Sequence, residues 1–166
     1  MASTFDYSID YASLDFRKNP ESYRTGKGEQ GVLLVEPYKS EILPHWRFKT
    51  EAIAKESASA ILKLFSAYAR EKDFVGMDMA RKFLQMGYTR SRRYANHRSG
   101  KKYNGPVPVG KKGESGAHGR KELPIDEDPE KAKSAEIFYA AWQKVRNHKI
   151  YAAMLADHKK QFDVKS

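Results

Sequence analysis

The stretch from residue 98 to residue 124 constrains the fold of this chain more than any other feature. It holds six of the eleven glycines and three of the seven prolines, and its few apolar anchors include Tyr103, Val107 and Val109. Glycine weakens a helix through its backbone freedom, and proline removes a backbone donor. The sequence therefore predicts a long loop that separates two helical parts. Loops of this length inside a compact domain are usually functional or disordered.

The helical part before this loop is predicted from apolar spacing and capping residues. Residues 50–70 place their apolar side chains on one stripe at helical spacing, and Thr50 is a suitable N-cap. A second helix is predicted to begin at Asp73 and to close before Gly87, which has the properties of a C-terminal capping glycine. Residues 89–96 then predict a third helix that is short and basic.

The part after the loop opens with a clear helix start. Asp128 is a good N-cap and Pro129 suits the first helical position. A final helical segment around Tyr151 either continues this helix or follows a bend near Asn147. Together, these patterns predict a mainly α fold, a compact bundle of about four helices.

Residues 1–49 are aromatic-rich and irregular, and we expect them to form an extended arm that wraps around the helices. The alternation of apolar and polar residues over Phe5–Tyr11 predicts a short strand, and the apolar run Val32–Val35 predicts another. The chain is interpreted as a single domain over residues 1–166. Its parts are the arm 1–49, the helical part 50–97, the basic Gly-rich loop 98–124 and the C-terminal helices 125–166.

Composition indicates a soluble globular protein. The 166 residues are 40% hydrophobic and 12% aromatic, which is enough for a core and argues against wholesale disorder. Cysteine is absent, so disulfides and thiolate metal sites are excluded. The longest apolar run, Val32–Val35, is far below the roughly 20 residues of a membrane-spanning helix. The first residues lack the pattern of a secretory signal, and we expect a cytoplasmic protein with no membrane partner.

Positive charge is concentrated in one part of the sequence. Residues 81–121, here called the basic segment, hold twelve Lys or Arg and one acid, Glu114. The basic segment therefore carries +11, whereas the rest of the chain carries −1. Such an asymmetry focuses electrostatic potential and attracts polyanions, whereas a surface that serves only solubility mixes both signs.

Three glycine-containing motifs approach known phosphate-binding loops, and each lacks part of the required context. Residues 26–31, GKGEQG, match GxGxxG, but no hydrophobic strand precedes them and no helix follows. Residues 105–112, GPVPVGKK, approach a P-loop, yet Lys112 stands where Ser or Thr should bind magnesium. Residues 110–113, GKKG, match the GXXG loop of KH modules without its flanking helices. We interpret the first as a turn and the last as a loop that binds a nucleic-acid backbone.

The sequence indicates no catalytic residue, no metal site and no cofactor. Without cysteine, a metal site would need histidine together with carboxylates, but His97 and His118 lie in the least acidic part of the chain. We expect each histidine to be a surface or capping side chain, with phosphate contact by His118 as a weaker alternative.

The leading hypothesis is a non-catalytic protein that binds nucleic acid, DNA or RNA, through the basic segment. Arg forks match phosphates, and exposed Tyr rings can stack on unpaired bases, although each tyrosine is by itself more typical of packing. If six phosphates of a duplex are neutralised, the log–log salt slope of affinity should be about −5. The candidate contact residues are Arg90, Arg92, Arg93, Tyr94, Arg98, Lys101, Lys102, Tyr103, Lys111, Lys112, His118 and Arg120.

Two alternatives stay open. An enzyme acting on a phosphorylated or acidic substrate would gather the cations around a concave pocket, with His97 or His118 as acid or base. A convex or flat patch would favour the binding hypothesis instead. An adaptor that docks an acidic protein partner would expose an apolar patch beside the charge.

Three segments resemble an uncharacterised family of small basic proteins, domain-of-unknown-function family 4385, seen in bacteria, their phages and some eukaryotes. These segments are EPYKSEILPHWRFKT (36–50), DFVGMDMARKFLQMGYTRSRRYANHRSGKKYNGPVP (73–108) and SGAHGR (115–120). The resemblance covers nearly the whole chain. It implies no established activity and no catalytic residue, and it suggests that the basic glycine-rich loop is a family feature.

Overall fold

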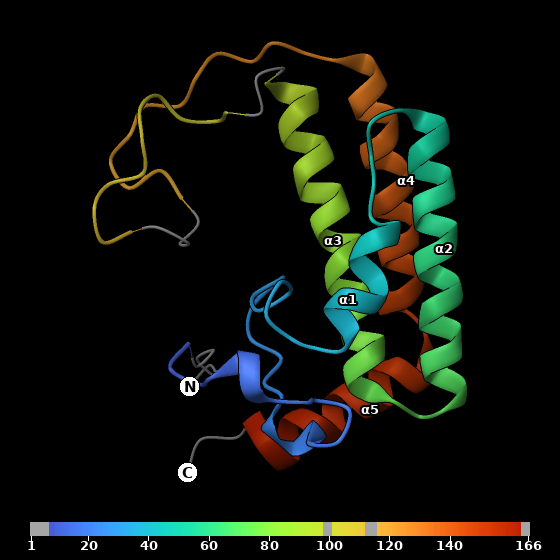
Figure 1. Cartoon of the computed structure of the whole chain (residues 1–166). Coiled ribbons are helices and arrows are strands. Elements are labelled where there is room, and N and C mark those ends of the chain that lie inside the picture. The colour runs from blue at the N-terminus through green and yellow to red at the C-terminus, as the bar shows by residue number, and fades with distance from the viewer. Residues whose placement is uncertain (1–6, 98–100, 112–115, 164–166) are drawn as a thin grey trace.

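The computed structural model describes residues 7–97, 101–111 and 116–163. Within these ranges the protein is mainly helical, with no β-strand and two isolated β-bridges, so the prediction of a mainly α bundle is confirmed. The α-helices, shown in Figure 1, are α1 (Tyr38–Ile42), α2 (Glu51–Arg70), α3 (Phe74–Asn96), α4 (Pro129–Arg146) and α5 (Lys149–His158). A single π-helical turn, Lys159–Asp163, follows α5.

Three long helices, α2, α3 and α4, pack side by side, and α5 crosses the end of this bundle (Figure 1). The predicted caps of these helices are confirmed, because a side chain accepts a hydrogen bond from a backbone amide of the first turn. Thr50 accepts from Ile53 at the start of α2, and Asp128 accepts from Glu130 at the start of α4. Of the two alternatives for the final helical segment, the structure has the bend near Asn147, between α4 and α5.

The prediction of two helices between Asp73 and Asn96 is wrong, because α3 runs without interruption from Phe74 to Asn96. Gly87 does not end a helix and lies buried within α3. An added Cβ at Gly87 would lie 2.4 Å from Cδ1 of Phe138, which is fully buried on α4. The glycine is therefore needed for close helix packing and not for a cap.

The N-terminal arm wraps against the bundle as expected, but the two predicted strands are wrong over the described residues. Residues 7–11 form turns and the start of a 3₁₀ turn, and Val32–Val35 lies in successive turns. The arm instead contributes buried side chains to the core, which include Tyr11, Phe16, Tyr23, Val32, Val35, Tyr38 and Ile42. Aromatic burial fixes the arm here in place of a strand ladder.

The residues described after α3 form the long loop that the glycine and proline content predicts. In Figure 1 this loop extends away from the bundle, between the ends of α3 and α4. Two backbone hydrogen bonds pair its outgoing and returning segments, from Asn104 to Lys121 and from Leu123 to Lys102. Within the described part of the chain, no helix is long and apolar enough to cross a membrane.

Candidate nucleic-acid interface

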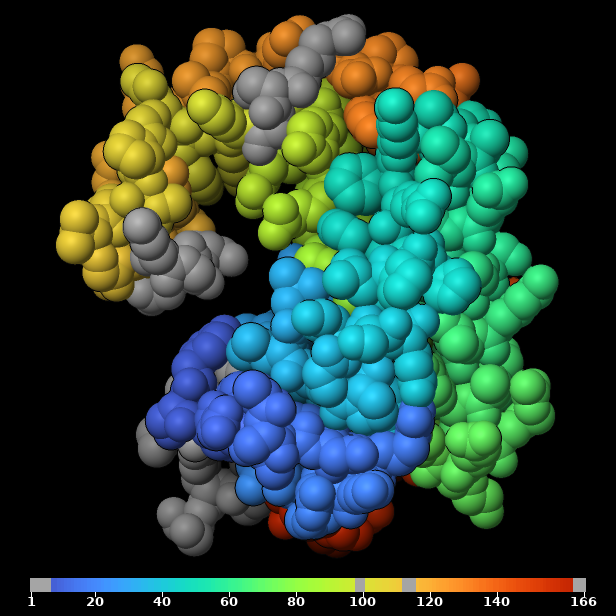
Figure 2. Space-filling model, viewed as in Figure 1, coloured from blue at the N-terminus to red at the C-terminus, as the bar shows by residue number. Residues whose placement is uncertain are grey.

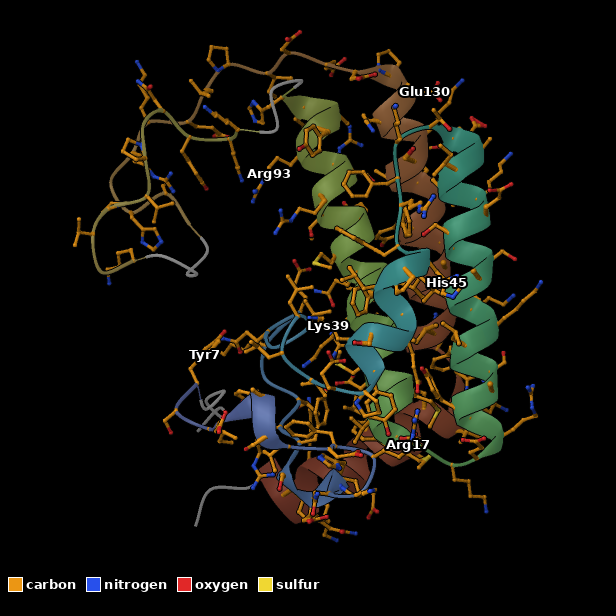
Figure 3. The ribbon with its side chains drawn as sticks, in the orientation of Figure 1. Tyr7, Arg17, Lys39, His45, Arg93 and Glu130 are labelled. Atoms are coloured by element: carbon orange, nitrogen blue, oxygen red, sulfur yellow. The ribbon has the colours of Figure 1, made fainter. Side chains whose placement is uncertain are left out.

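The surface beside the second half of α3 is hollowed. Figure 2 shows this hollow between the long loop, α3 and the N-terminal arm. The Arg93 side chain extends from α3 toward it, and Tyr7 lies on the arm across from the loop (Figure 3). A pocket of about 580 Å³ lies between α3 and the arm, and Arg90 and Arg93 line it from α3. The hollow is therefore basic on its α3 side.

The arm contributes a cation, an acid and apolar side chains to this pocket. Lys27 lines it and is exposed, and Tyr7 is 60% exposed at the same pocket. Leu33 and Leu34, which are 48% and 36% exposed, also line it. The pocket therefore combines positive charge with apolar surface, which suits both the phosphates and the bases of a single strand.

Glu29 is the acid of this pocket among the described lining residues. Burial raises the pKa of the Glu29 carboxyl, while a hydrogen bond from Thr89 and the charges of Arg90 and Arg93 oppose that rise. One acid lies with three cations (Lys27, Arg90 and Arg93), so the lining carries an excess of positive charge. That excess is available to a polyanion.

The candidate contact residues divide into exposed and packed groups. The exposed cations are Arg90, Arg93, Lys101, Lys102 and Lys111. Arg92 is partly buried and donates a hydrogen bond of 3.3 Å to Asn96. Arg98 and Lys112 lie outside the described residues.

Arg120 has a structural role within the loop. Its guanidinium donates to the carbonyl oxygens of Ala117 at 2.9 Å and Gly116 at 3.0 Å, and it lies 4.9 Å from the centre of the Tyr103 ring. Lys102 approaches the same ring at 5.5 Å. Cations therefore already occupy the neighbourhood of Tyr103, which limits its use as a stacking platform.

The other stacking candidate, Tyr94, lies away from the hollow. It packs against Phe48 with ring centres 5.9 Å apart, and Nζ of Lys131 lies 5.8 Å from its ring centre. Together with Arg47 and Lys49, these residues line a separate pocket of about 420 Å³. The structure thus does not bring the predicted tyrosines together with Arg90 and Arg93.

Neither candidate histidine is among the described residues that line the pocket between α3 and the arm. His97 is 3% exposed at the end of α3, and its Nδ1 lies 3.1 Å from the carbonyl oxygen of Pro124. His97 therefore fastens the returning end of the loop to α3. His118 lies in a turn of the loop with a φ of 49°. Among the described residues, no cluster of three or more histidines or carboxylates is placed to hold a metal ion.

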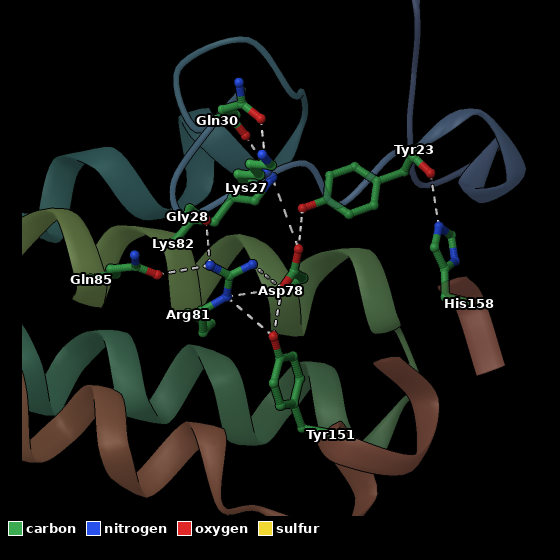
Figure 4. A network of polar contacts seen from close by, with 10 residues as sticks. All are labelled: Tyr23, Lys27, Gly28, Gln30, Asp78, Arg81, Lys82, Gln85, Tyr151 and His158. Carbon is green, nitrogen blue, oxygen red and sulfur yellow. Dashed lines mark hydrogen bonds and ion pairs between the residues drawn. The ribbon is translucent and has the colours of Figure 1, made fainter. Parts of the chain in front are cut away.

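Two cations of the basic segment, Arg81 and Lys82, are buried and belong to the core. Figure 4 shows them around Asp78, whose carboxylate is fully buried and accepts from the hydroxyls of Tyr23 and Tyr151. Arg81 donates to Asp78 at 2.7 Å and to the carbonyl of Gly28, and Lys82 donates to the carbonyl of Gln30 at 2.6 Å. The network therefore ties the GKGEQG turn to α3.

Electrostatics keeps the central carboxylate ionised. Burial by itself would raise the pKa of Asp78, but the charges of Arg81 and Lys82 and the two tyrosine hydrogen bonds outweigh it and lower the pKa to about 2. Burial and the adjacent carboxylate raise the pKa of the Tyr23 and Tyr151 hydroxyls, which stay neutral donors. The cations of this part of the basic segment thus stabilise the fold and do not face solvent.

Sequence reasoning missed the part of the hollow that the arm supplies. Tyr7, Leu33 and Leu34 lie in segments predicted as strands, and Lys27 belongs to a motif interpreted only as a turn. Arg90 and Arg93 are three residues apart and share one face of α3, as the helix predicted over residues 89–96 already implies. No local pattern predicts that the arm returns to this face.

These features define a class: a small helical-bundle protein with a basic loop and a basic hollow beside it. The chain matches the family model described as a domain of unknown function, DUF4385, over residues 6–161. The chain therefore belongs to the DUF4385 family. No curated protein matches it, and no solved structure matches it.

Proposed function

We propose that this protein binds the sugar–phosphate backbone of a nucleic acid in the hollow between α3, the N-terminal arm and the long loop. The observation that carries the proposal is the convergence of Arg90 and Arg93 from α3 and Lys27 from the arm on one pocket. The long loop borders the same hollow and carries the exposed cations Lys101 and Lys102 (Figure 2). Phosphate contacts of this kind supply most of the affinity of non-specific nucleic-acid binding.

The shape of the hollow is compatible with a flexible strand. A concave basic surface is the shape expected for the enzyme alternative, but that alternative also places His97 or His118 at the pocket as acid or base. Nδ1 of His97 lies at hydrogen-bond distance from the carbonyl oxygen of Pro124. Neither His97 nor His118 is among the described residues that line the pocket. Tyr7 and Leu33 offer apolar surface on which an unstacked base can lie. Binding without catalysis is therefore favoured.

Fluorescence anisotropy with labelled 20-nucleotide single strands and duplexes tests the proposal. The double variant Arg90→Ala/Arg93→Ala removes two exposed cations, and we expect at least a tenfold weaker affinity at low salt. The log–log salt slope of the wild type should be about −5 for six phosphate contacts, and its magnitude should fall by about two in the variant.

A matched control removes the same charge elsewhere. Lys55 and Lys63 are exposed on α2, on the side of the bundle away from the loop (Figure 1), and Lys55→Ala/Lys63→Ala should leave affinity within about twofold. An equal loss in this control would contradict a defined interface. Undetectable or salt-insensitive binding of the wild type at low ionic strength would contradict nucleic-acid binding itself.

A further inference from the structure

A second basic pocket also borders the GKGEQG turn and shares only Gly28 and Gln85 with the first among the described lining residues. It has a volume of about 640 Å³, within the usual range for small-molecule sites. The arm lines it with Gly26 and Gly28, α3 with Arg81, and the end of α4 with Arg146. Tyr151 of α5 and Lys159, which directly follows α5, complete the wall. Segments from four parts of the chain therefore meet at one cavity.

Three cations from three elements converge on this cavity, and none of its described lining residues is acidic. Arg81 forms an inner wall, because its hydrogen bonds to Asp78, Gln85 and Gly28 hold the guanidinium in one position. The Arg146 guanidinium lies 5.4 Å from the centre of the Trp142 ring, which orients it at the same cavity. An anion entering here meets positive charge without a competing carboxylate on the described walls.

Beside the cations and the polar side chains of Thr25 and Gln85, the lining has an apolar wall. Ala152, Leu155 and Ala156 of α5 and Trp142 of α4 face the cavity beside the cations. Sites that bind small molecules typically combine such apolar walls with a few placed polar groups. A free inorganic anion would use only the charged part of this cavity, whereas an organic anion would use both parts.

We infer that this pocket binds a small organic phosphate, a phosphate monoester attached to a compact apolar group. Arg146 and Lys159 contact the phosphate, and the Arg81 guanidinium, which is paired with Asp78, forms the wall behind them. The apolar group lies against Trp142, Leu155 and Ala156. The inference does not depend on nucleic-acid binding, because Arg146 and Lys159 are not among the described residues of the hollow beside Arg93.

Isothermal titration calorimetry with phenyl phosphate at low salt is the direct test. Inorganic phosphate and phenol, titrated separately, show what the phosphate group and the aromatic ring each contribute. We expect saturable binding of phenyl phosphate with a dissociation constant below about 1 mM. Inorganic phosphate should bind at least fivefold more weakly, and phenol should show no saturable binding. Absence of saturable phenyl phosphate binding would overturn the proposal, and equal affinity for inorganic phosphate would overturn the role of the apolar wall.

Variants locate the binding site. Arg146 and Lys159 are exposed, so Arg146→Ala and Lys159→Ala should retain the fold, which circular dichroism checks. Each should weaken phenyl phosphate binding about tenfold, since each removes a charge-assisted contact. Lys144→Ala is the matched control, because Lys144 is exposed in the same last turn of α4 but does not line the cavity. Unchanged binding in both pocket variants, or an equal loss in the control, would overturn the assignment.

Discussion

The helix bundle and the long loop use the same kind of side chain in opposite ways. In the bundle, Arg81 and Lys82 are buried and donate to Asp78 and to backbone carbonyls of the arm. In the loop, Lys101, Lys102 and Lys111 are exposed. The comparison shows that positive charge concentrated in sequence is divided in space between a structural cluster and a solvent-facing surface.

The two regions also differ in what holds them together. The bundle buries large side chains on every long helix, whereas Val109 in the loop is fully exposed. The described part of the loop is held by turns, by the two backbone bonds between its segments, by the Arg120 contacts and by the contact between His97 and Pro124. Regions with few buried apolar contacts open at low free-energy cost. Substitutions of buried residues in the bundle should therefore change global stability, whereas substitutions in the loop should leave it nearly unchanged.

The largest expected effect comes from removing the charge at the centre of the bundle. Asp78→Asn leaves Arg81 buried beside a neutral amide, and we expect a loss of about 3–5 kcal/mol in the free energy of unfolding, measured with urea. Glu136→Gln on α4 is the control, because Glu136 is exposed, and its effect should stay within about 0.5 kcal/mol. A loss below about 1 kcal/mol for Asp78→Asn would contradict a structural role for the cluster.

The same carboxylate predicts a pH dependence. The pKa of Asp78 is lowered from 3.8 to about 2, so its stabilising contribution is complete above about pH 4 and is lost as the pH falls toward 2. The wild type should therefore lose about 2 kcal/mol more than Asp78→Asn across this interval. Parallel urea midpoints of the two proteins between pH 4 and pH 2 would contradict this linkage.

A smaller effect compares one glycine from each region. Gly87→Ala inserts a methyl group 2.4 Å from the Phe138 ring, and we expect a loss of about 1–3 kcal/mol from overpacking. Gly105 has nothing within 4 Å of an added Cβ but has a φ of +89°, so Gly105→Ala strains only the loop backbone. Its effect on global unfolding should be below about 1 kcal/mol. Equal losses at the two positions would remove the distinction between bundle and loop.

The smallest effect is expected at the tip of the loop. Val109 is fully exposed, so Val109→Ser should change the free energy of unfolding by less than about 0.5 kcal/mol. Thermal unfolding followed by circular dichroism is sufficient to check this. A larger loss would mean that the loop packs more tightly in solution than its exposure indicates.

The sequence predicts what depends on local chemistry. Thr50 and Asp128 cap helices because their side chains bond amides two or three residues away, and such signals are visible in any short window. Gly87 was misread because its partner, Phe138, lies on another helix, and no local pattern distinguishes a close approach from a cap. The two strands predicted in the arm are wrong for the same reason, because aromatic burial against distant helices holds the arm in place.

The candidate site was predictable only in part. The exposure of Arg90 and Arg93 agrees with the surface role proposed for them, although their binding stays a prediction. Arg81 and Lys82 carry the same positive charge as Arg90 and Arg93, but they are buried. Their burial requires partners, Asp78 and the carbonyl oxygens of the arm, that only the folded chain brings close. Charge counting cannot separate the two cases, because desolvation depends on tertiary contacts.

The attachment of the arm has a consequence for the order of folding during synthesis. The carbonyl oxygen of Gly28 accepts a hydrogen bond from Arg81, and the carbonyl oxygen of Tyr23 lies 2.8 Å from Nε2 of His158. Neither contact can form before its later residue has been synthesised. Tyr23 therefore meets His158 only after the ribosome has added the 135 residues that lead from Tyr23 to this histidine. Contacts so distant in sequence form late, so we expect the arm to dock only after α5 has been synthesised.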